Sequence, residues 1–549
     1  MTGPVTDETV AQLSGRVLAD LGVGHAFGVV GSGNFHLTNS LRDAGVPWLA
    51  ARHEGGAASM ADGYARLSPL PAVVTTHQGC GLTNAVTGIT EAAKSRTPVI
   101  VLTADTQAAA INSNFRIDQD ALARSVGAVA ERVHGPASAV EDLVRAYRTA
   151  VVGRRTVVVS LPLDIQAAPA PRYDGGATVT APEPVRPAAV AVDRFAELLA
   201  AAQRPVFVAG RGGRGAREEL SALAAHSGAL LATSAVANGL FEGEEFGLGI
   251  SGGFSSPLTA ELIAGADLVV GWGCAMNMWT MRHGSLIGPD ATVVQVDDTE
   301  AAIGAHRPVD LGIVGDVTAT ASDVLEAAGS CAARVGYRTH EIRARIAEAR
   351  WWNQTPTPDL STADRIDPRV LTAELDRSLP AERVVAIDSG NFMGYPSAYL
   401  RVPDQNGFCF TQAYQSIGLG LGSGIGAALA QPDRLAVVGT GDGGFLMSIS
   451  ELETAVRLRR PMLVVVYNDA AYGAEVHHFD GDLSTVTFPD VDVAAVARGY
   501  GARALTVRST TDLAPVRDWA TAPEGVMVLD AKVADDGGSW WLAEAFKGH

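Results

Sequence analysis

Cysteine, aromatic side chains, basic charge and long apolar runs are all scarce in this chain of 549 residues. The four cysteines are scattered and lack the spacing of a metal site, which predicts a reducing, cytoplasmic location. The 42 Lys and Arg residues are outnumbered by 60 Asp and Glu, and the formal net charge of −18 argues against nucleic acid or an anionic membrane as partners. No uninterrupted apolar run approaches the ~18 residues of a membrane span.

With 47% hydrophobic residues and 60 glycines, the chain has enough apolar and small side chains to form buried α/β cores. Short apolar runs alternate with helical patterns, which predicts an α/β fold of three doubly wound parallel-sheet domains. We expect these domains at residues 1–166, 190–331 and 365–549, joined by two Pro-rich linkers. The expected strands lie at 26–30, 48–51, 72–76, 99–103, 156–160, 204–210, 230–233, 267–272, 292–297, 384–387, 435–439, 462–467 and 525–529.

Two aspartates follow two neighbouring apolar runs in the third domain. Asp442 lies in Gly441-Asp442-Gly443 after the run 435–439, and Asp469 follows the run 462–467. Both therefore emerge at the carboxyl ends of strands joined by one crossover helix. Ser448 and Glu451 are predicted to open that helix as a capping box. Two carboxylates beside glycines suit a hard cation that holds a phosphate group.

The spacing and surroundings of these residues resemble the diphosphate-binding motif of thiamine-diphosphate (ThDP) enzymes. The resemblance implies that Mg2+ is bound by the side chains of Asp442 and Asp469 and by the carbonyl of Ala471. Asp469 stands where the family usually has asparagine, which adds a negative charge next to an anionic diphosphate. Further cofactor contacts are expected at Asn84, Ser389, Gly390, Asn391, Gly441, Gly443, Gly444, Tyr472 and Gly473.

A second segment, Ala51–Arg66, resembles the catalytic-glutamate segment of the same family. It places Glu54 at a strand-to-helix transition. The alternative interpretation is that Glu54 only stabilises the helix, because a negative charge in the first turn interacts favourably with the helix dipole. With the distant metal motif present, the catalytic interpretation is preferred: a carboxyl group bonded to the pyrimidine N1′ promotes removal of the proton on thiazolium C2. Ile417, in Gln415–Gly420, resembles the apolar wedge that keeps the two cofactor rings close, although core packing explains it equally well.

Residues that would face the substrate resemble two different branches of the family. Ser32 and His77 fall where benzoylformate decarboxylase has a serine and a histidine, and histidine suits proton transfer near neutral pH. Gln119 resembles a glutamine that many carboligases keep near the cofactor. We expect all three to be catalytic, the alternative for His77 being a polar residue near a loop.

The middle domain contains Gly210–Gly215, a match to the dinucleotide fingerprint G-x-G-x-x-G directly after an expected strand. The acidic residue that should end the next strand is missing. Some relatives bind FAD in this domain and simple decarboxylases do not, so FAD is an open but disfavoured cofactor.

The resemblance implies a ThDP- and Mg2+-dependent enzyme, most like acetolactate synthase, that decarboxylates a 2-oxo acid and transfers the resulting acyl carbanion to a carbonyl acceptor. The alternatives are a simple decarboxylase of the benzoylformate type and a catalytically retired regulatory subunit. In this family each site is built between the pyrimidine-binding (first) domain of one subunit and the diphosphate-binding (third) domain of another. A homodimer or homotetramer is therefore expected, with small molecules as the other partners.

Overall fold

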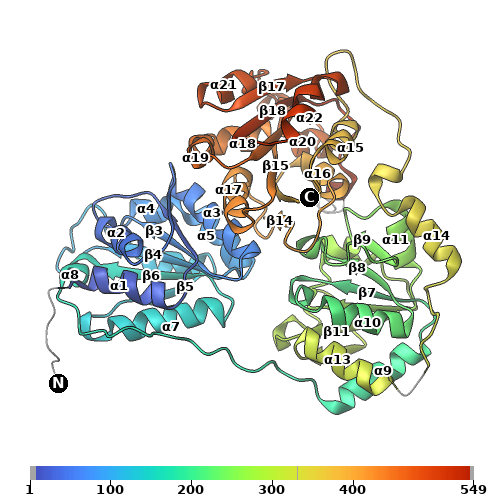
Figure 1. The fold of residues 1–549 in the computed structure, drawn as a ribbon, viewed down its shortest axis with the longest axis horizontal. Coiled ribbons are helices and arrows are strands. Elements are labelled where there is room, and N and C mark those ends of the chain that lie inside the picture. Colours follow the sequence, from blue (N-terminus) through green and yellow to red (C-terminus); the bar gives the residue numbers. More distant parts are fainter. Residues whose placement is uncertain (1–7, 330–331, 544–549) are drawn as a thin grey trace.

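A computed structural model describes residues 8–329 and 332–543. Three sheets of six strands each, all paired in parallel, carry helices on both faces (Figure 1). The expected α/β fold with three doubly wound sheets is confirmed.

The first sheet has the strand order β2-β1-β3-β4-β6-β5. Its strands are β1 His25–Gly28, β2 Trp48–Ala50, β3 Ala72–Thr76, β4 Val99–Asp105, β5 Val129–Arg132 and β6 Val157–Pro162. Its helices are α1 Val10–Asp20, α2 Phe35–Asp43, α3 Glu54–Leu67, α4 Cys80–Asn84, α5 Val86–Lys94, α6 Gln119–Ser125, α7 Ala139–Val151 and α8 Leu163–Ala167.

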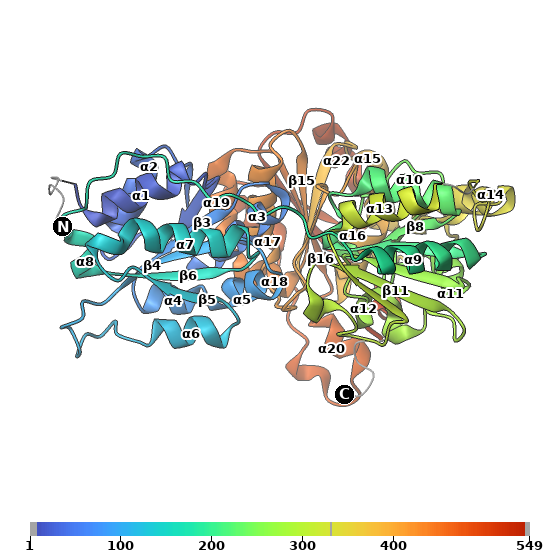
Figure 2. The same ribbon diagram turned by 90° about the horizontal axis from the view of Figure 1, so that it is seen from below.

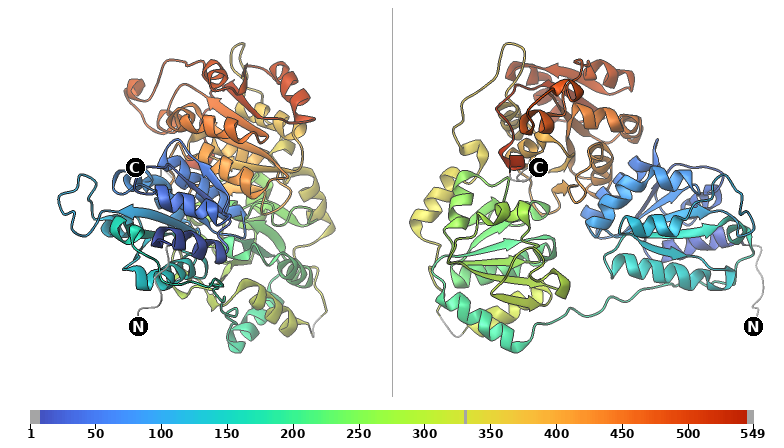
Figure 3. Two further views of the ribbon diagram at one scale, coloured as in Figure 1. Left: turned by 60° about the vertical axis from the view of Figure 1, so that its left-hand side comes forward. Right: turned by 180° about the vertical axis from the view of Figure 1, so that it is seen from behind.

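The middle sheet has the order β12-β11-β10-β7-β8-β9. Its strands are β7 Pro205–Ala209, β8 Leu230–Thr233, β9 Gly247–Ile250, β10 Leu268–Trp272, β11 Thr292–Asp297 and β12 Leu311–Val314. The accompanying helices are α9 Ala189–Ala201, α10 Arg217–Ser227, α11 Pro257–Ala264, α12 Met278–Met281, α13 Val317–Ala328 and α14 His340–Ala349. The segment between α8 and α9 is extended and runs from the first domain to the middle one (Figures 1, 2 and 3).

The third sheet, ordered β14-β13-β15-β16-β18-β17, repeats the strand order of the first. Its strands are β13 Arg383–Ile387, β14 Phe408–Phe410, β15 Leu435–Gly441, β16 Met462–Asn468, β17 Arg503–Val507 and β18 Val526–Lys532. Its helices are α15 Pro368–Ser378, α16 Gly394–Tyr399, α17 Gly420–Ala430, α18 Asp442–Ser448, α19 Ser450–Leu458, α20 Gly473–His478, α21 Val493–Gly499, α22 Ala514–Ala520 and α23 Trp540–Ala543. In both sheets the strand order reverses at the first strand, and such a reversal is where ligands bind in open α/β sheets.

The first and third domains share one apolar core, because α3 packs directly on α17. Glycines let the two helices approach backbone to backbone. A Cβ on Gly426 would lie 2.1 Å from the carbonyl oxygen of Met60, and one on Gly63 would lie 2.4 Å from that of Ser423. These two domains therefore form a single packed unit.

The predicted capping box is wrong. Ser448 ends α18, where its hydroxyl donates to the carbonyl of Gly444, and Ile449 caps α19 without a side-chain hydrogen bond. The Glu451 carboxylate points instead at the first domain, where backbone donors are available to it. No helix within residues 8–329 and 332–543 is both long and apolar enough to span a bilayer. Cys80, Cys274 and Cys409 are free thiols, and Cys331 lies outside the described residues.

Candidate active site

A cavity of about 840 Å³ opens at the carboxyl edge of the third sheet, where β13 and β15 lie side by side at the reversal of strand order. Predicted cofactor and metal residues from four separate segments meet there, each at the end of a different strand. They are Ser389, Gly390, Asn391, Ile417, Gly441, Asp442, Gly443, Gly444, Asp469, Ala471, Tyr472 and Gly473.

Asp442 and Asp469 are adjacent in this cavity because β15 and β16 pair in register, with Gly441 opposite Tyr467. Burial raises the pKa of both carboxyl groups, and the charge of Asp442 raises that of Asp469 further. A divalent cation between the two carboxylates would offset the free-energy cost of their burial and mutual repulsion. Among residues 8–329 and 332–543, no group of three His, Cys, Asp or Glu side chains gathers as a metal site. The remaining ligands must then be uncharged or come from a bound molecule, and the carbonyl of Ala471 is suitably close in sequence.

The walls of the cavity fit a polar ligand that approaches the backbone. A Cβ on Gly473 would lie 2.4 Å from Oδ2 of Asp469, so only glycine leaves this ligand space. Oδ1 of Asn391 and both amide atoms of Gln412 are buried at the cavity without a hydrogen-bond partner in the described chain. Gln412 was missed from the sequence, since nothing in its pattern separates it from an ordinary loop residue. These atoms are suited to the hydrogen-bonding groups of a bound cofactor or substrate.

Asp388 is a second residue that sequence reasoning missed. It is fully buried at the end of β13 and accepts hydrogen bonds from the amides of Ser389 (2.8 Å) and Gly418 (2.9 Å) and from the hydroxyl of Thr440 (3.0 Å). Burial raises the pKa of Asp388 to about 6. Its place directly after an apolar strand, like that of Asp442, was the available signal. Asp388 fixes the far end of the loop that carries Ile417.

Glu54 lies at the first residue of α3 and is 9% exposed. Nδ2 of Asn84 donates to its carboxylate at 3.1 Å. The start of α3 is held by Glu451, whose carboxylate accepts from the amides of His53 (2.9 Å) and Arg52 (3.1 Å). A buried carboxylate of the third domain thus fixes the position of Glu54.

Ser32 and His77 are brought together at the ends of β1 and β3, with Oγ of Ser32 3.4 Å from Nε2 of His77. The ring of Phe115 stands edge-on to the imidazole. Gln119 is 2% exposed; it accepts from the amide of Gly79 and donates to the carbonyl of Ala104. In this chain Gln119 braces the turn after His77, and its catalytic role stays a prediction.

Two half-sites are therefore present, each at the reversal of strand order of its own sheet. All described residues that line the cavity fall between Trp279 and Leu542, so none belongs to the first domain. Glu54, Asn84, Ser32, His77 and Gln119 form the other half-site, at the carboxyl edge of the first sheet.

The G-x-G-x-x-G loop of the middle domain is engaged with the two other domains. The guanidinium of Arg214 donates to the carbonyl of Arg66 (2.9 Å) and to the carbonyl of Gln405 (2.8 Å). Gly212 packs against Gly273: a Cβ on Gly212 would lie 2.8 Å from the Cα atom of Gly273. The loop serves domain docking, and FAD stays an untested and disfavoured prediction.

Comparison with known proteins agrees with this geometry. Residues 8–124, 192–324 and 388–531 match the N-terminal TPP binding domain, the central domain and the C-terminal TPP binding domain of thiamine pyrophosphate enzymes. A probable 2-ketoarginine decarboxylase of Pseudomonas aeruginosa is 32% identical over 530 residues, covering 92% of this chain and 90% of that protein. A sulfoacetaldehyde acetyltransferase of Alcaligenes xylosoxydans xylosoxydans is 28% identical (90% and 87% covered). An acetolactate synthase of Bacillus subtilis is 27% identical (95% and 93% covered).

The chain belongs to the thiamine-pyrophosphate-dependent family of 2-oxo acid enzymes. It is accordingly an enzyme with ThDP-binding domains, and the family resemblance drawn from the two sequence motifs is confirmed.

Proposed function

We propose that this enzyme uses ThDP and Mg2+ to decarboxylate a 2-oxo acid and to pass the remaining acyl group to a carbonyl acceptor. The observation that carries the proposal is the pair of adjacent carboxyl groups of Asp442 and Asp469 at a cavity of about 840 Å³. Near-full-length similarity to an acetolactate synthase supports the transfer step.

Bound ThDP would supply the electron sink for cleavage next to the carbonyl group. The side chains of Asp442 and Asp469 and the carbonyl of Ala471 would hold Mg2+ and, through it, the diphosphate. Ile417, held in a loop at the cavity, would support the cofactor rings. Glu54, ordered by Asn84, would exchange a proton with the pyrimidine ring.

This assignment needs a second copy of the chain, because the half-site with Glu54 and the half-site with Asp442 are on different edges of one chain. A two-fold symmetric dimer would bring each first-domain edge onto the third-domain edge of its partner and complete two sites. The matching strand orders of the two sheets support this arrangement.

A simple decarboxylase is the second candidate, and two observations favour it. The pair Ser32 and His77 can move a proton in the half-site of the first domain. Three carboxylates, Glu475, Asp535 and Asp536, also line the cavity, where they would suit a 2-oxo acid with a cationic side chain. The relative from Pseudomonas aeruginosa is described as acting on such a substrate, 2-ketoarginine.

A retired regulatory subunit is the least supported candidate, since Glu54, Asp442 and Asp469 are all kept. Product analysis separates the three. Pyruvate, benzoylformate and 2-ketoarginine are each supplied with and without an aldehyde acceptor. Carbon dioxide together with a hydroxyketone supports the carboligase, and an aldehyde alone, with or without acceptor, supports the decarboxylase. No carbon dioxide from any 2-oxo acid would overturn both.

A further inference from the structure

One segment of the cavity wall, residues 411–419, follows β14 and precedes α17, and it carries Gln412 and Ile417 into the cavity. Its middle residues, Ala413, Tyr414 and Gln415, are exposed and so have no apolar core to hold them. Gln415 also adopts a positive φ of 63°, which non-glycine residues seldom do without external support. The segment must therefore be held in place by polar contacts.

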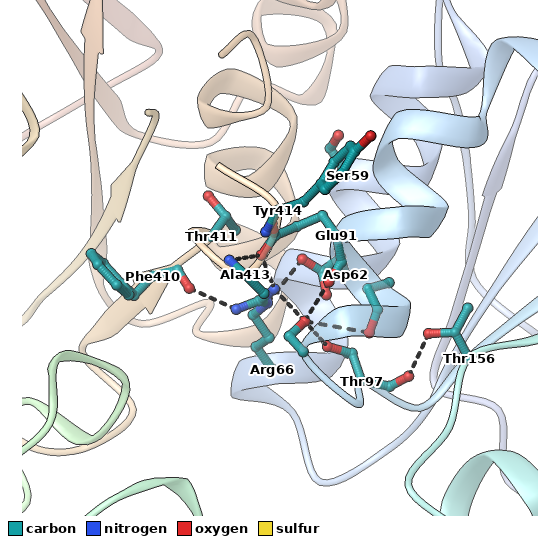
Figure 4. Close-up of polar contacts among 12 residues, drawn as sticks. Ser59, Asp62, Arg66, Glu91, Thr97, Thr156, Phe410, Thr411, Ala413 and Tyr414 are labelled. Atoms are coloured by element: carbon teal, nitrogen blue, oxygen red, sulfur yellow. Dashed lines mark hydrogen bonds and ion pairs between the residues drawn. The ribbon is translucent and has the colours of Figure 1, made fainter. Parts of the chain in front are cut away.

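Glu91, on α5 of the first domain, supplies those contacts, as Figure 4 shows. Its carboxylate is 1% exposed, accepting from the amide of Ala413 at 3.0 Å through Oε1 and from the amide of Tyr414 at 2.6 Å through Oε2. At the other end of the segment, Asp388 accepts from the amide of Gly418. Two buried carboxylates thus clamp the stretch that presents Ile417.

Arg66 compensates the buried charge of Glu91. Its Nη2 donates to Oε1 of Glu91 at 2.6 Å and its Nε donates to Asp62 at 2.8 Å. Its Nη1 donates at 2.6 Å to the carbonyl of Phe410, the residue directly before the segment. The side chains of Arg66, Asp62 and Glu91 are at most 8% exposed. The first domain therefore fixes both the residue that precedes the segment and the residues in its middle.

We propose that Glu91 is a positioning residue for the active site, which holds segment 411–419 so that Gln412 and Ile417 stay aimed into the cavity. Its role in cofactor activation rests on the proposed function, in which Ile417 supports the ThDP rings. Glu91 itself touches neither the cavity nor a predicted ligand.

The carboxylate chemistry makes this testable with an isosteric change. Both oxygens of Glu91 accept from amides, whereas glutamine offers one oxygen and one NH2 group. In Glu91→Gln the NH2 must face either the amide of Tyr414 or the pair of donors from Arg66 and Ala413, so contacts to the segment are lost. Asp62→Asn is the matched control, because it changes a carboxylate on the same arginine that bonds no atom of the segment. Glu91→Asp keeps the charge beside Arg66 but withdraws from the segment by one methylene, and it replaces Glu91→Gln if that variant does not fold.

The first measurement is amide hydrogen exchange of the full-length protein, followed in peptides that cover 411–419. Exchange should accelerate about tenfold or more in Glu91→Gln and stay at the wild-type rate in Asp62→Asn. The second is C2–H/D exchange of bound ThDP by NMR, which should slow by about ten- to a hundredfold in Glu91→Gln while ThDP affinity changes little.

Unchanged exchange of the segment, or equal acceleration in Asp62→Asn, would overturn the role of Glu91 even if the wild-type enzyme turns over 2-oxo acids. A loosened segment with wild-type C2 exchange would overturn the link to cofactor activation. Failure of the wild-type protein to bind ThDP would instead overturn the proposed function, which is a separate and recognisable result.

Discussion

The contact between α3 and α17 should not tolerate one added methyl group. An alanine at position 426 would place its Cβ 2.1 Å from the carbonyl oxygen of Met60 and 2.7 Å from the amide nitrogen of Tyr64. Both are backbone atoms of α3, so no side chain can turn away. Ordinary contact begins near 3.4 Å, and the two helices must separate by about 1 Å.

The cost follows from that displacement. Overpacking of this kind costs about 1–3 kcal/mol, and a radial gap of up to 1 Å forfeits roughly a quarter to a half of the dispersion energy between the facing atoms. Because the steric conflict involves backbone on both sides, we expect a gross cost of about 3–4 kcal/mol, of which the better helix propensity of alanine offsets about 1 kcal/mol. Because the entropy of unfolding grows with chain length, the net loss of about 2–3 kcal/mol corresponds to a fall in melting temperature of roughly 2–5 °C for a unit of this size.

Gly499→Ala, at the end of α21, is the matched control, since a Cβ there meets no atom within 4 Å. It should be neutral or stabilise by up to about 1 kcal/mol. Differential scanning calorimetry of the two variants and the wild type measures both effects. A Gly426→Ala protein that melts with the wild type would show that α3 and α17 do not pack at the described distance, and the shared core of the first and third domains would have to be abandoned.

Three further predictions concern the site itself. Glu54→Gln should leave folding and ThDP binding nearly intact while slowing C2 deprotonation by orders of magnitude; wild-type C2–H/D exchange by NMR would remove Glu54 from catalysis. Asp442→Ala should abolish Mg2+-dependent ThDP binding measured by calorimetry, whereas Asp469→Asn should be tolerated or should tighten binding, because it removes one of two adjacent, mutually repelling carboxylates; loss of binding in Asp469→Asn would contradict this account of the pair. Inactive Glu54→Gln and Asp442→Ala protomers, mixed so that subunits exchange, should regain activity, since one site of each mixed dimer is intact; verified heterodimers without activity would refute sites shared between chains.

The sequence predicted every inner strand of the three sheets but, of the six edge strands in the described chain, only β2. The runs Val99–Leu102 and Met462–Val466 are continuously apolar because parallel inner strands are buried on both faces. β5, with Glu131 and Arg132, and β17, which begins at Arg503, each border solvent on one side and lack that pattern. Because such edge strands lack a continuous apolar run, they were not predicted from the sequence.

The position of a site residue was predictable where it follows from the end of its own strand, as for Asp442 and Glu54, whose chemical roles stay predictions. It was not predictable where a role depends on a contact between distant segments. Glu451 looked like half of a local capping box and instead holds the backbone before Glu54, about 400 residues earlier in the chain. Glu91 gives no local signal of its contact with segment 411–419, because Ala413 and Tyr414 reach it only through their backbone amides.

The glycine-faced contact of α3 with α17 also has a consequence for synthesis of the protein on the ribosome. The face of α3 that carries Gly63 is complete once Leu67 has emerged, but its cover, α17, begins only at Gly420. At about 5–20 residues per second, the roughly 350 residues between them take on the order of 20–70 s to make. Throughout that interval the nascent first domain presents an uncovered apolar surface, and chaperone occupancy should peak while the middle domain is being translated.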